Sequence, residues 1–319
     1  MAIDGTKVLA NASKHAAVSY ERAGERMREL DLEIERLLRK ADEADSAPLE
    51  EGLSIPQEVQ RRAERQAKLA AARAEMELRA QARVQEEKAA YESKVAEREK
   101  ERQSGKKPRG REPSAPQDKP GSKDQMNFTD PESRIMKSAS GFEQSYNAQA
   151  AVEVDSRLIV GRRVTDAPND KEQLLPGCRM IEPAAGALRE ILVDSGFLSE
   201  AAVTEIEKSG AVRVLAAVKR ESHGRSVQQL ERKADPPEPG PQAAFAERMA
   251  HRVATKAGRE RYKLRQQTIE PIFGIIKEAL GFRRFSLRGL ARVNTEWTLV
   301  TLAYNLKRLF HLKAALQTA

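Results

Sequence analysis

The chain has 319 residues, of which 39% are hydrophobic and 33% are charged, a composition typical of a soluble and highly charged protein. Lys and Arg number 56 against 48 for Asp and Glu, and the net charge of +8 favours a polyanionic partner, nucleic acid first. A well-solvated helical surface would have the same balance. The single Cys178 and four scattered histidines exclude a disulfide framework and argue against a zinc enzyme; one cysteine fits a reducing cytoplasm.

The first part of the chain combines a short extended segment with a long helical region. Residues 1–16 are predicted to form the first strand, and residues 17–103 are highly charged with helical periodicity. A break at residues 46–52 and an alanine-rich stripe from Val59 to Val95 predict two helices that pack as an antiparallel hairpin, like a coiled coil. The alternative is a solvated charged helix that merely separates two other elements.

A change of composition separates this region from the rest of the chain. Residues 104–125 are rich in Pro, Gly, Ser and Lys and are predicted to be a flexible basic linker. This linker either lies along a phosphate backbone or serves only as a tether. Residues 126–319 alternate between strand and helix patterns, and residues 145–154 and 158–165 within them predict a β-hairpin.

The remaining elements complete an alternating α/β pattern. Strands are predicted at residues 188–193 and 212–218, helices at 171–182, 199–210, 255–277 and 290–312, and a proline-rich loop at 220–243. The last helix is expected to present one apolar face, composed of Trp297, Leu299, Leu302, Leu306 and Leu309. Strands that alternate with helices imply a sheet covered on its faces, and the hairpin makes that sheet mixed.

Three acidic residues lie in three different kinds of local sequence. Asp4 lies in the first predicted strand, Asp194 ends the buried run EILV, and Glu270 lies in a helix directly before Pro271. Taken singly, Asp4 fits an ordinary turn, Asp194 fits a turn cap and Glu270 fits a helix surface. Together they supply the oxygen ligands that Mg²⁺ prefers, and two ions about 3.5–4 Å apart can activate the attacking oxygen and stabilise the leaving one.

Two further features lie near the third acid. Lys277 comes seven positions after Glu270, about two helical turns along the same predicted face, and is expected to reach a phosphate. A solvated helix lysine is the alternative. The aromatic residues that follow are expected in the core rather than stacked on bases, because their neighbours have helical spacing: Phe282, Phe285 and Trp297.

Four segments form a connected series: residues 4–15 (DGTKVLANASKH), 129–170, 190–200 (EILVDSGFLSE) and 262–309. This series resembles the DDE transposases of bacterial insertion sequences. Within that family, it is similar to the superfamily grouped around insertion sequences 4 and 5, and most of all to the insertion-sequence-1182 type. The resemblance covers most of the chain outside the helical region and the proline-rich loop.

The resemblance implies a ribonuclease-H-like fold, with a mixed sheet flanked by helices and a helical hairpin inserted after the first strand. It implies that Asp4, Asp194 and Glu270 are the catalytic residues and the ligands of two Mg²⁺ or Mn²⁺ ions. Water would attack a transposon-end phosphodiester, and the freed 3′-hydroxyl would then attack target DNA. The partner would be double-stranded DNA, bound by a homodimer in the cytoplasm at the nucleoid.

The family pattern around the glutamate contains Tyr, Arg, Glu and Lys at set spacings. Here Glu270 and Lys277 keep the family separation, whereas Tyr262 and Arg265 lie one position farther from Glu270 and Gln266 stands at the family's Arg position. Arginine suits phosphate because its planar fork binds two oxygens. The residues expected to contact DNA are Tyr262, Lys263, Arg265, Lys277, Arg283, Arg284 and Arg288.

Family members carry an amino-terminal helical region before the first acid, whereas only three residues precede Asp4. The chain is therefore expected to lack that region and most of the first strand, with a loss of ladder bonds and core contacts. Two other functions stay open. One is a non-catalytic DNA-binding remnant whose helical hairpin mediates assembly, and the other is a different ribonuclease-H-like nuclease, such as a junction resolvase.

Overall fold

The computed structural model divides the chain into two units, residues 1–14 with 132–319 and residues 15–131. It describes residues 1–44, 54–105, 112–138, 141–218, 234–240 and 242–318. The predicted helix break at 46–52 and most of the predicted loop at 220–243 lie outside these residues. Within them, none of the helices combines the length and apolar character that crossing a bilayer requires.

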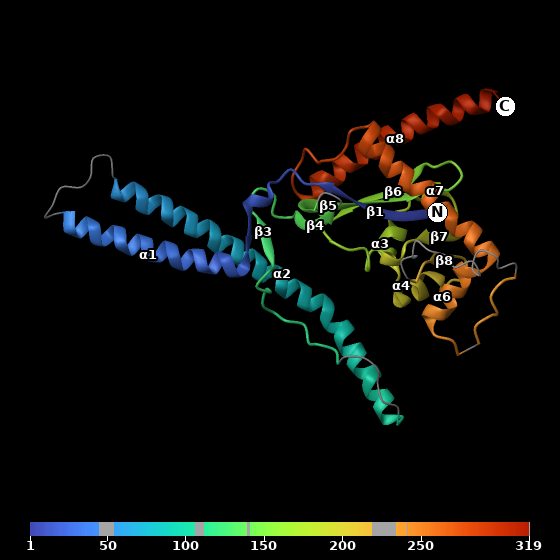
Figure 1. Ribbon diagram of the computed structural model, residues 1–319, viewed down its shortest axis with the longest axis horizontal. Coiled ribbons are helices and arrows are strands. Elements are labelled where there is room, and N and C mark those ends of the chain that lie inside the picture. Colours follow the sequence, from blue (N-terminus) through green and yellow to red (C-terminus); the bar gives the residue numbers. More distant parts are fainter. Residues whose placement is uncertain (45–53, 106–111, 139–140, 219–233, 241, 319) are drawn as a thin grey trace. The chain divides into compact units, whose positions relative to one another are not determined.

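The first unit is built on a mixed six-stranded sheet (Figure 1). The strands are β1 (Ala2–Leu9), β4 (Arg134–Ser138), β5 (Gly141–Val152), β6 (Ile159–Thr165), β7 (Glu190–Val193) and β8 (Arg213–Ala216). Their spatial order is β4-β5-β1-β7-β8, and β6 also pairs with β5. β1, β7 and β8 are parallel to one another, whereas β5 is antiparallel to its partners. The fold is therefore mixed α/β.

The first strand lies at the centre of this sheet. β1 pairs with β5 along all its residues, with Asp4 opposite Ala150, and on its other side Ala2 pairs with Leu192 of β7. β1 has eight residues and its apolar side chains are packed, while its pairing with β7 is confined to Ala2. The fully buried ones are Ala2, Ile3 and Val8.

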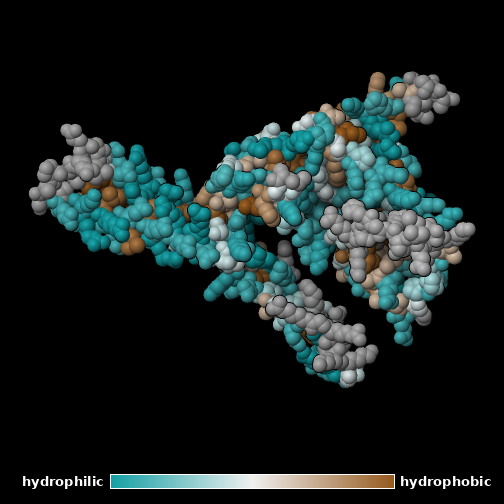
Figure 2. All heavy atoms as spheres, viewed as in Figure 1, coloured by the Kyte–Doolittle hydropathy of each residue, from teal (hydrophilic) through white to brown (hydrophobic). Residues whose placement is uncertain are grey.

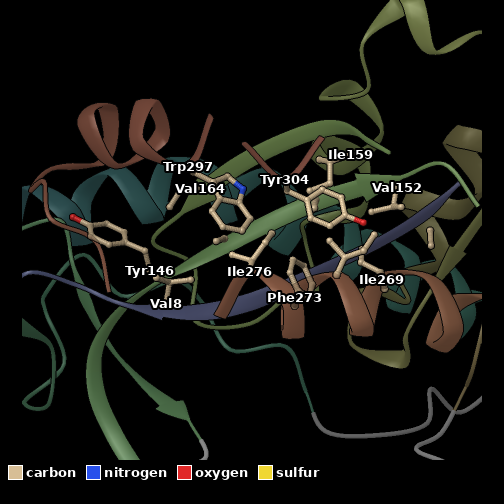
Figure 3. Close-up of a cluster of buried hydrophobic side chains, with 14 of the residues drawn as sticks. Val8, Tyr146, Val152, Ile159, Val164, Ile269, Phe273, Ile276, Trp297 and Tyr304 are labelled. Carbon is tan, nitrogen blue, oxygen red and sulfur yellow. The ribbon is translucent and has the colours of Figure 1, made fainter. Parts of the chain in front are cut away.

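Helices cover both faces of the sheet. On one face, α7 (Lys256–Gly274) and α8 (Leu290–Thr318) enclose a core that includes Val8, Tyr146 and Trp297 (Figure 3). The other face carries α3 (Leu174–Arg179), α4 (Glu200–Glu207) and α6 (Phe245–Ala254), whose core includes Ile191 and Phe197. Because side chains alternate along a strand, neighbouring residues of β1 serve different cores.

The aromatic residues after α7 lie in the core, as predicted. Trp297 and Phe285 are almost fully buried, and Phe282 packs beside both, with ring centroids 5.3 Å from Phe285 and 6.1 Å from Trp297. The indole Nε1 of Trp297 donates to the carbonyl of Gln149 at 3.0 Å. These contacts fix α8 to β5.

Several element predictions need correction. The hairpin of residues 145–165 is present as β5 and β6, whereas β4 and α6 were not predicted. The helix expected over 171–182 is the single short α3, which contains Pro176 and Gly177. Ser199 occupies the N-cap position of α4 without a side-chain capping bond. The helix that carries Glu270 ends at Gly274 and continues as a π-helical turn, Ile275–Ala279.

The second unit contains α1 (Tyr20–Ala44), α2 (Ile55–Gln103) and a small sheet of β2 (Ala17–Ser19) and β3 (Gln125–Asn127); a 3₁₀ turn, Lys14–Ala16, precedes β2. The long helices are antiparallel, because successive contacts join Tyr20 to Glu77, Asp31 to Gln66 and Glu33 to Arg62. Hydrophilic residues dominate the visible surface of both units (Figure 2).

The alanine stripe predicted for α2 does not form the helix contact. Ala63, Ala67 and Ala70 are exposed, and so is Leu78. Leu69 and Met76 are buried in their place, and each removes more apolar surface from water than an alanine would. The buried residues of α2, among those described, are Ile55, Leu69, Ala72, Met76 and Ala80.

Candidate functional site

Asp4 lies in β1, and Asp194 directly follows the adjacent parallel strand β7. Ala2 of β1 is opposite Leu192 of β7, and Asp4 and Asp194 each follow this pair by two residues. Side chains two residues apart point to the same face of a sheet, so both carboxylates belong to the face that α7 covers. The sheet therefore brings together acids that are remote in sequence.

Asp194 is fixed by the backbone that follows it. Its Oδ1 accepts hydrogen bonds from Gly196 N at 2.8 Å and from Phe197 N at 3.3 Å, and it caps a 3₁₀ turn, Ser195–Phe197. The predicted turn cap is thus present. It does not compete with a ligand role, because both bonds use the same carboxylate oxygen.

Asp4 is a largely buried carboxyl group with a perturbed pKa. Its Oδ1 accepts from Gly5 N at 2.8 Å, and its Oδ2 accepts from Arg265 Nη1 at 3.1 Å. Burial, followed by the neighbouring charge of Asp194, raises the pKa of Asp4 to about 7, against the opposing effects of Arg265 and Gly5 N–H. Two carboxylates placed this close favour a cation between or beside them.

Arg265 joins Asp4 to the third acid. The residue is only 8% exposed, and its second terminal nitrogen, Nη2, donates to Glu270 Oε1 at 3.2 Å. The side chain of Glu270 itself is 53% exposed. Arg265 is therefore held between two of the predicted acids, whereas the sequence analysis predicted that it contacts DNA.

Tyr262 and Lys277 tie the helical layer to the two strands that carry the acids. Tyr262 OH donates to the carbonyl of Val193, directly before Asp194, at 3.1 Å, and burial raises the pKa of this tyrosine. Lys277 lies in the π-helical turn and donates to Thr6 Oγ1 at 2.6 Å and to the carbonyl of Lys7 at 2.9 Å. Burial and nearby Arg283 lower the pKa of Lys277.

A polar cluster that the sequence did not predict lies on the opposite face of β1. Asp170 Oδ1 accepts from Asn147 Nδ2 at 2.6 Å and from Gln149 Nε2 at 3.2 Å. These amides stand opposite Lys7 and Gly5 in the β1–β5 register. The charge of Asp170 also contributes to the raised pKa of Asp4. Asn147 and Gln149, two positions apart and so on one face of β5, were the available signal.

The predicted arginine contacts lie beside the end of β1. Arg283, Arg284 and Arg288 are exposed on the segment that leads into α8. That segment is bonded to the strand end, since Leu9 N donates to the carbonyl of Arg283 at 3.1 Å and Arg288 Nε donates to the carbonyl of Asn11 at 2.9 Å. Lys263 is exposed on α7.

The donor chemistry of the three acids suits a divalent cation. Carboxylate oxygens are the ligands that Mg²⁺ and Mn²⁺ prefer, and the burial that raises the pKa of Asp4 disfavours an ionised form that a nearby positive charge would stabilise. In the present arrangement, Arg265 supplies that charge. Across the described residues, no three His, Cys, Asp or Glu side chains are grouped to hold a metal ion.

One segment of the chain matches a known protein family. Residues 236–310 match a family model described as the transposase DDE domain. The matched segment contains α6, α7 and the π-helical turn, and with them Tyr262, Arg265, Glu270 and Lys277. No curated protein matches the chain, and no solved structure matches it. The chain thus contains a DDE transposase domain in this segment.

Proposed function

We propose that the chain is a transposase that cuts DNA at transposon ends and transfers the freed strand by metal-dependent phosphodiester chemistry. The DDE transposase match to residues 236–310 makes a transposase role the starting point. The observation that carries the proposal is the network in which Arg265 binds both Asp4 and Glu270, while Asp4 and Asp194 each lie two residues after the paired Ala2 and Leu192. Strand, strand end and helix each contribute one acid.

The strand order supports a ribonuclease-H-like class for the first unit. Counted along the chain, β1, β5, β6, β7 and β8 would be its five strands, in the spatial order β6-β5-β1-β7-β8 with only β5 antiparallel to the rest. The helices α1 and α2 lie between β1 and β5 in sequence, and would then be a hairpin inserted into that core.

Asp4, Asp194 and Glu270 are the residues that would hold Mg²⁺ or Mn²⁺. Two such ions, when bound, activate the attacking oxygen and stabilise the leaving one. Asp194 is held by two backbone N–H groups and Asp4 by one, so neither needs to reorganise. Glu270 is the mobile member, because its half-exposed side chain can leave Arg265 by rotation alone.

The basic residues around the acids fit a DNA backbone. Lys277 places an ammonium group beside β1, and Arg283, Arg284 and Arg288 present exposed guanidinium groups at its end. Guanidinium groups bind phosphate oxygens in pairs. Tyr262 and Lys263 lie on the same helix as Glu270, and Arg265 would reach DNA once it has released the acids.

Strand cleavage is the test. A duplex that carries the terminal sequences flanking the gene is incubated with the chain and Mg²⁺, and nicks with 3′-hydroxyl ends are mapped. We expect nicking at the element boundary, a loss of at least about 10³-fold in Asp194→Asn, and unchanged nicking in Asp155→Asn, which alters an exposed turn acid.

Two results would contradict the proposal. Binding of this duplex without cleavage under any divalent metal would favour a non-catalytic DNA-binding protein. Cleavage of branched junctions in preference to the terminal duplex would favour a junction resolvase.

A further inference from the structure

The outer side of α8 carries a row of exposed apolar side chains. The sequence prediction that they share a face with Trp297 is wrong, because at about 100° per residue Leu299 points about 200° away from Trp297. Val293, Trp297 and Tyr304 are buried against the sheet, and hydrophobic residues also reach the surface in the region of α8 (Figures 1 and 2). The exposed residues are Leu299 (61%), Leu302 (51%), Leu306 (59%), Leu309 (49%) and Phe310 (72%).

The helix cannot turn to bury this row, because its inner side is bonded to β6. The amide group of Asn294 accepts from Val164 N at 2.7 Å and donates to the carbonyl of the same residue at 3.2 Å. At the first residue of β6, the side-chain amide of Asn305 accepts from Ile159 N at 2.9 Å and donates to the carbonyl of Ile159 at 2.8 Å. The exposure of the leucines is therefore a fixed property of the fold.

The spacing of the row identifies the kind of partner. Leu299, Leu302, Leu306 and Leu309 follow steps of three, four and three residues, the a and d positions of a heptad repeat. An apolar row of this kind on a protein surface marks an interaction site. The e and g positions of this repeat, which flank the row on either side, carry no charge: Thr298, Ala303, Asn305, Phe310 and Leu312. A surface for nucleic acid would need Lys or Arg there, whereas a second copy of the same row needs none.

We propose that α8 is a homodimer interface, in which the leucine rows of two copies pack against each other in antiparallel orientation. The first half of α8 balances Arg292 with Glu296, whereas the second half carries Lys307, Arg308 and Lys313. In a parallel pair, these three cations would lie beside the same three cations of the second copy and repel them. Antiparallel packing sets them beside the balanced end and also opposes the two helix dipoles. This interface involves neither the acids nor DNA, so it does not rest on the proposed function.

The test is the mass of the full chain in solution, without DNA or metal, by sedimentation equilibrium. We expect a dimer for the wild type and a monomer for Leu302→Glu/Leu306→Glu. The matched control is Leu32→Glu/Leu38→Glu, which places the same charges on leucines of α1 that are 53% and 51% exposed, and it is expected to remain dimeric. Circular dichroism melting separates lost dimerisation from lost folding.

A charge-exchange experiment tests the orientation and does not depend on a single variant. In an antiparallel pair centred near Tyr304, position 302 of one copy faces position 306 of the other. Leu302→Glu/Leu306→Glu and Leu302→Lys/Leu306→Lys should each be monomeric alone and should form a dimer when mixed. A monomeric wild type, a Glu variant that remains dimeric, or a mixture that stays monomeric would each overturn the proposal.

Discussion

Arg265 and Asp4 are 261 positions apart in the sequence, and the guanidinium of the first donates to the carboxylate of the second at 3.1 Å. The same guanidinium holds Glu270, so one cation connects β1 to the middle of α7. The charges of the candidate site therefore also contribute to the packing of helix on sheet, and changes at the site should be visible in stability as well as in activity.

The pH dependence of stability should report the perturbed Asp4. Because the folded pKa of about 7 lies above the ordinary aspartate value of 3.8, the folded chain keeps a proton that the unfolded chain loses, so this group lowers stability as pH rises from about 4 to about 7. Asp4→Asn lacks that group. Its free energy of unfolding relative to the wild type should rise by at most about 4 kcal/mol over this window.

Urea unfolding at pH 4, 5.5 and 8 in the presence of a chelator measures this difference, with Asp155→Asn as the control. A difference between Asp4→Asn and wild type that is constant with pH would contradict the assignment of the raised pKa to Asp4.

Replacing Arg265, the cation between Asp4 and Glu270, should lower the free energy of unfolding. Arg265→Met leaves the buried Asp4 carboxylate without its partner, and we expect a loss of about 2–4 kcal/mol at pH 8. The loss should be smaller at pH 5, where Asp4 takes up a proton. Arg261→Met, on the same helix, removes only a half-exposed ion pair with Glu190 and should cost less than about 1 kcal/mol. Equal losses in both variants, measured by urea unfolding, would argue against a buried network.

Gly5 should resist any side chain. A Cβ at this position would lie 2.5 Å from Asn147 Oδ1 and 2.9 Å from Asp170 Oδ1, so Gly5→Ala must displace the polar cluster behind β1. We expect a loss of about 1–3 kcal/mol in thermal or urea unfolding. Gly274→Ala is the control, since nothing lies within 4 Å of its added Cβ, and it should stabilise the helix end by up to about 1 kcal/mol. A neutral Gly5→Ala would show that the cluster is not packed as described.

The arginines beside the end of β1 should set the salt dependence of DNA binding. If each contacts one phosphate, replacing Arg283, Arg284 and Arg288 with Gln should reduce the slope of log K against log salt by about 2.7 in total. The control replaces three exposed cations, two of them at the amino ends of β7 and β8: Arg189, Lys208 and Arg213. Fluorescence anisotropy between 50 and 300 mM salt measures both slopes, and equal reductions would remove the arginine segment from the DNA path.

The sequence predicted those parts of the fold whose local pattern agrees with their final environment. Residues 145–165 alternate, and they form β5 and β6. α6 was missed although Phe245, Met249 and Val253 recur at four-residue steps, because it directly follows a proline-rich segment that was assigned as a loop. The outer face of α8 was misread because leucines there look like core leucines, and only the bonds of Asn294 and Asn305 to β6 decide which face is inside.

For the site, too, the sequence predicted the residues but not their arrangement. Asp4, Asp194 and Glu270 were identified by type and position, but their arrangement depends on strand register that no local pattern contains. In the sequence, Arg265 lies one position farther from Glu270 than the arginine of the family pattern. Its side chain is long enough to reach both Asp4 and Glu270 from α7. Asp170 was missed because it lies in a loop and acts across the sheet, through Asn147 and Gln149.

The most direct measurement is the binding of Mn²⁺ to the purified chain, followed by electron paramagnetic resonance and calorimetry. The account predicts binding by the wild type and by Asp155→Asn, and at least about tenfold weaker binding by each of Asp4→Asn, Asp194→Asn and Glu270→Gln. Wild-type affinity in all three acid variants would contradict a shared metal site.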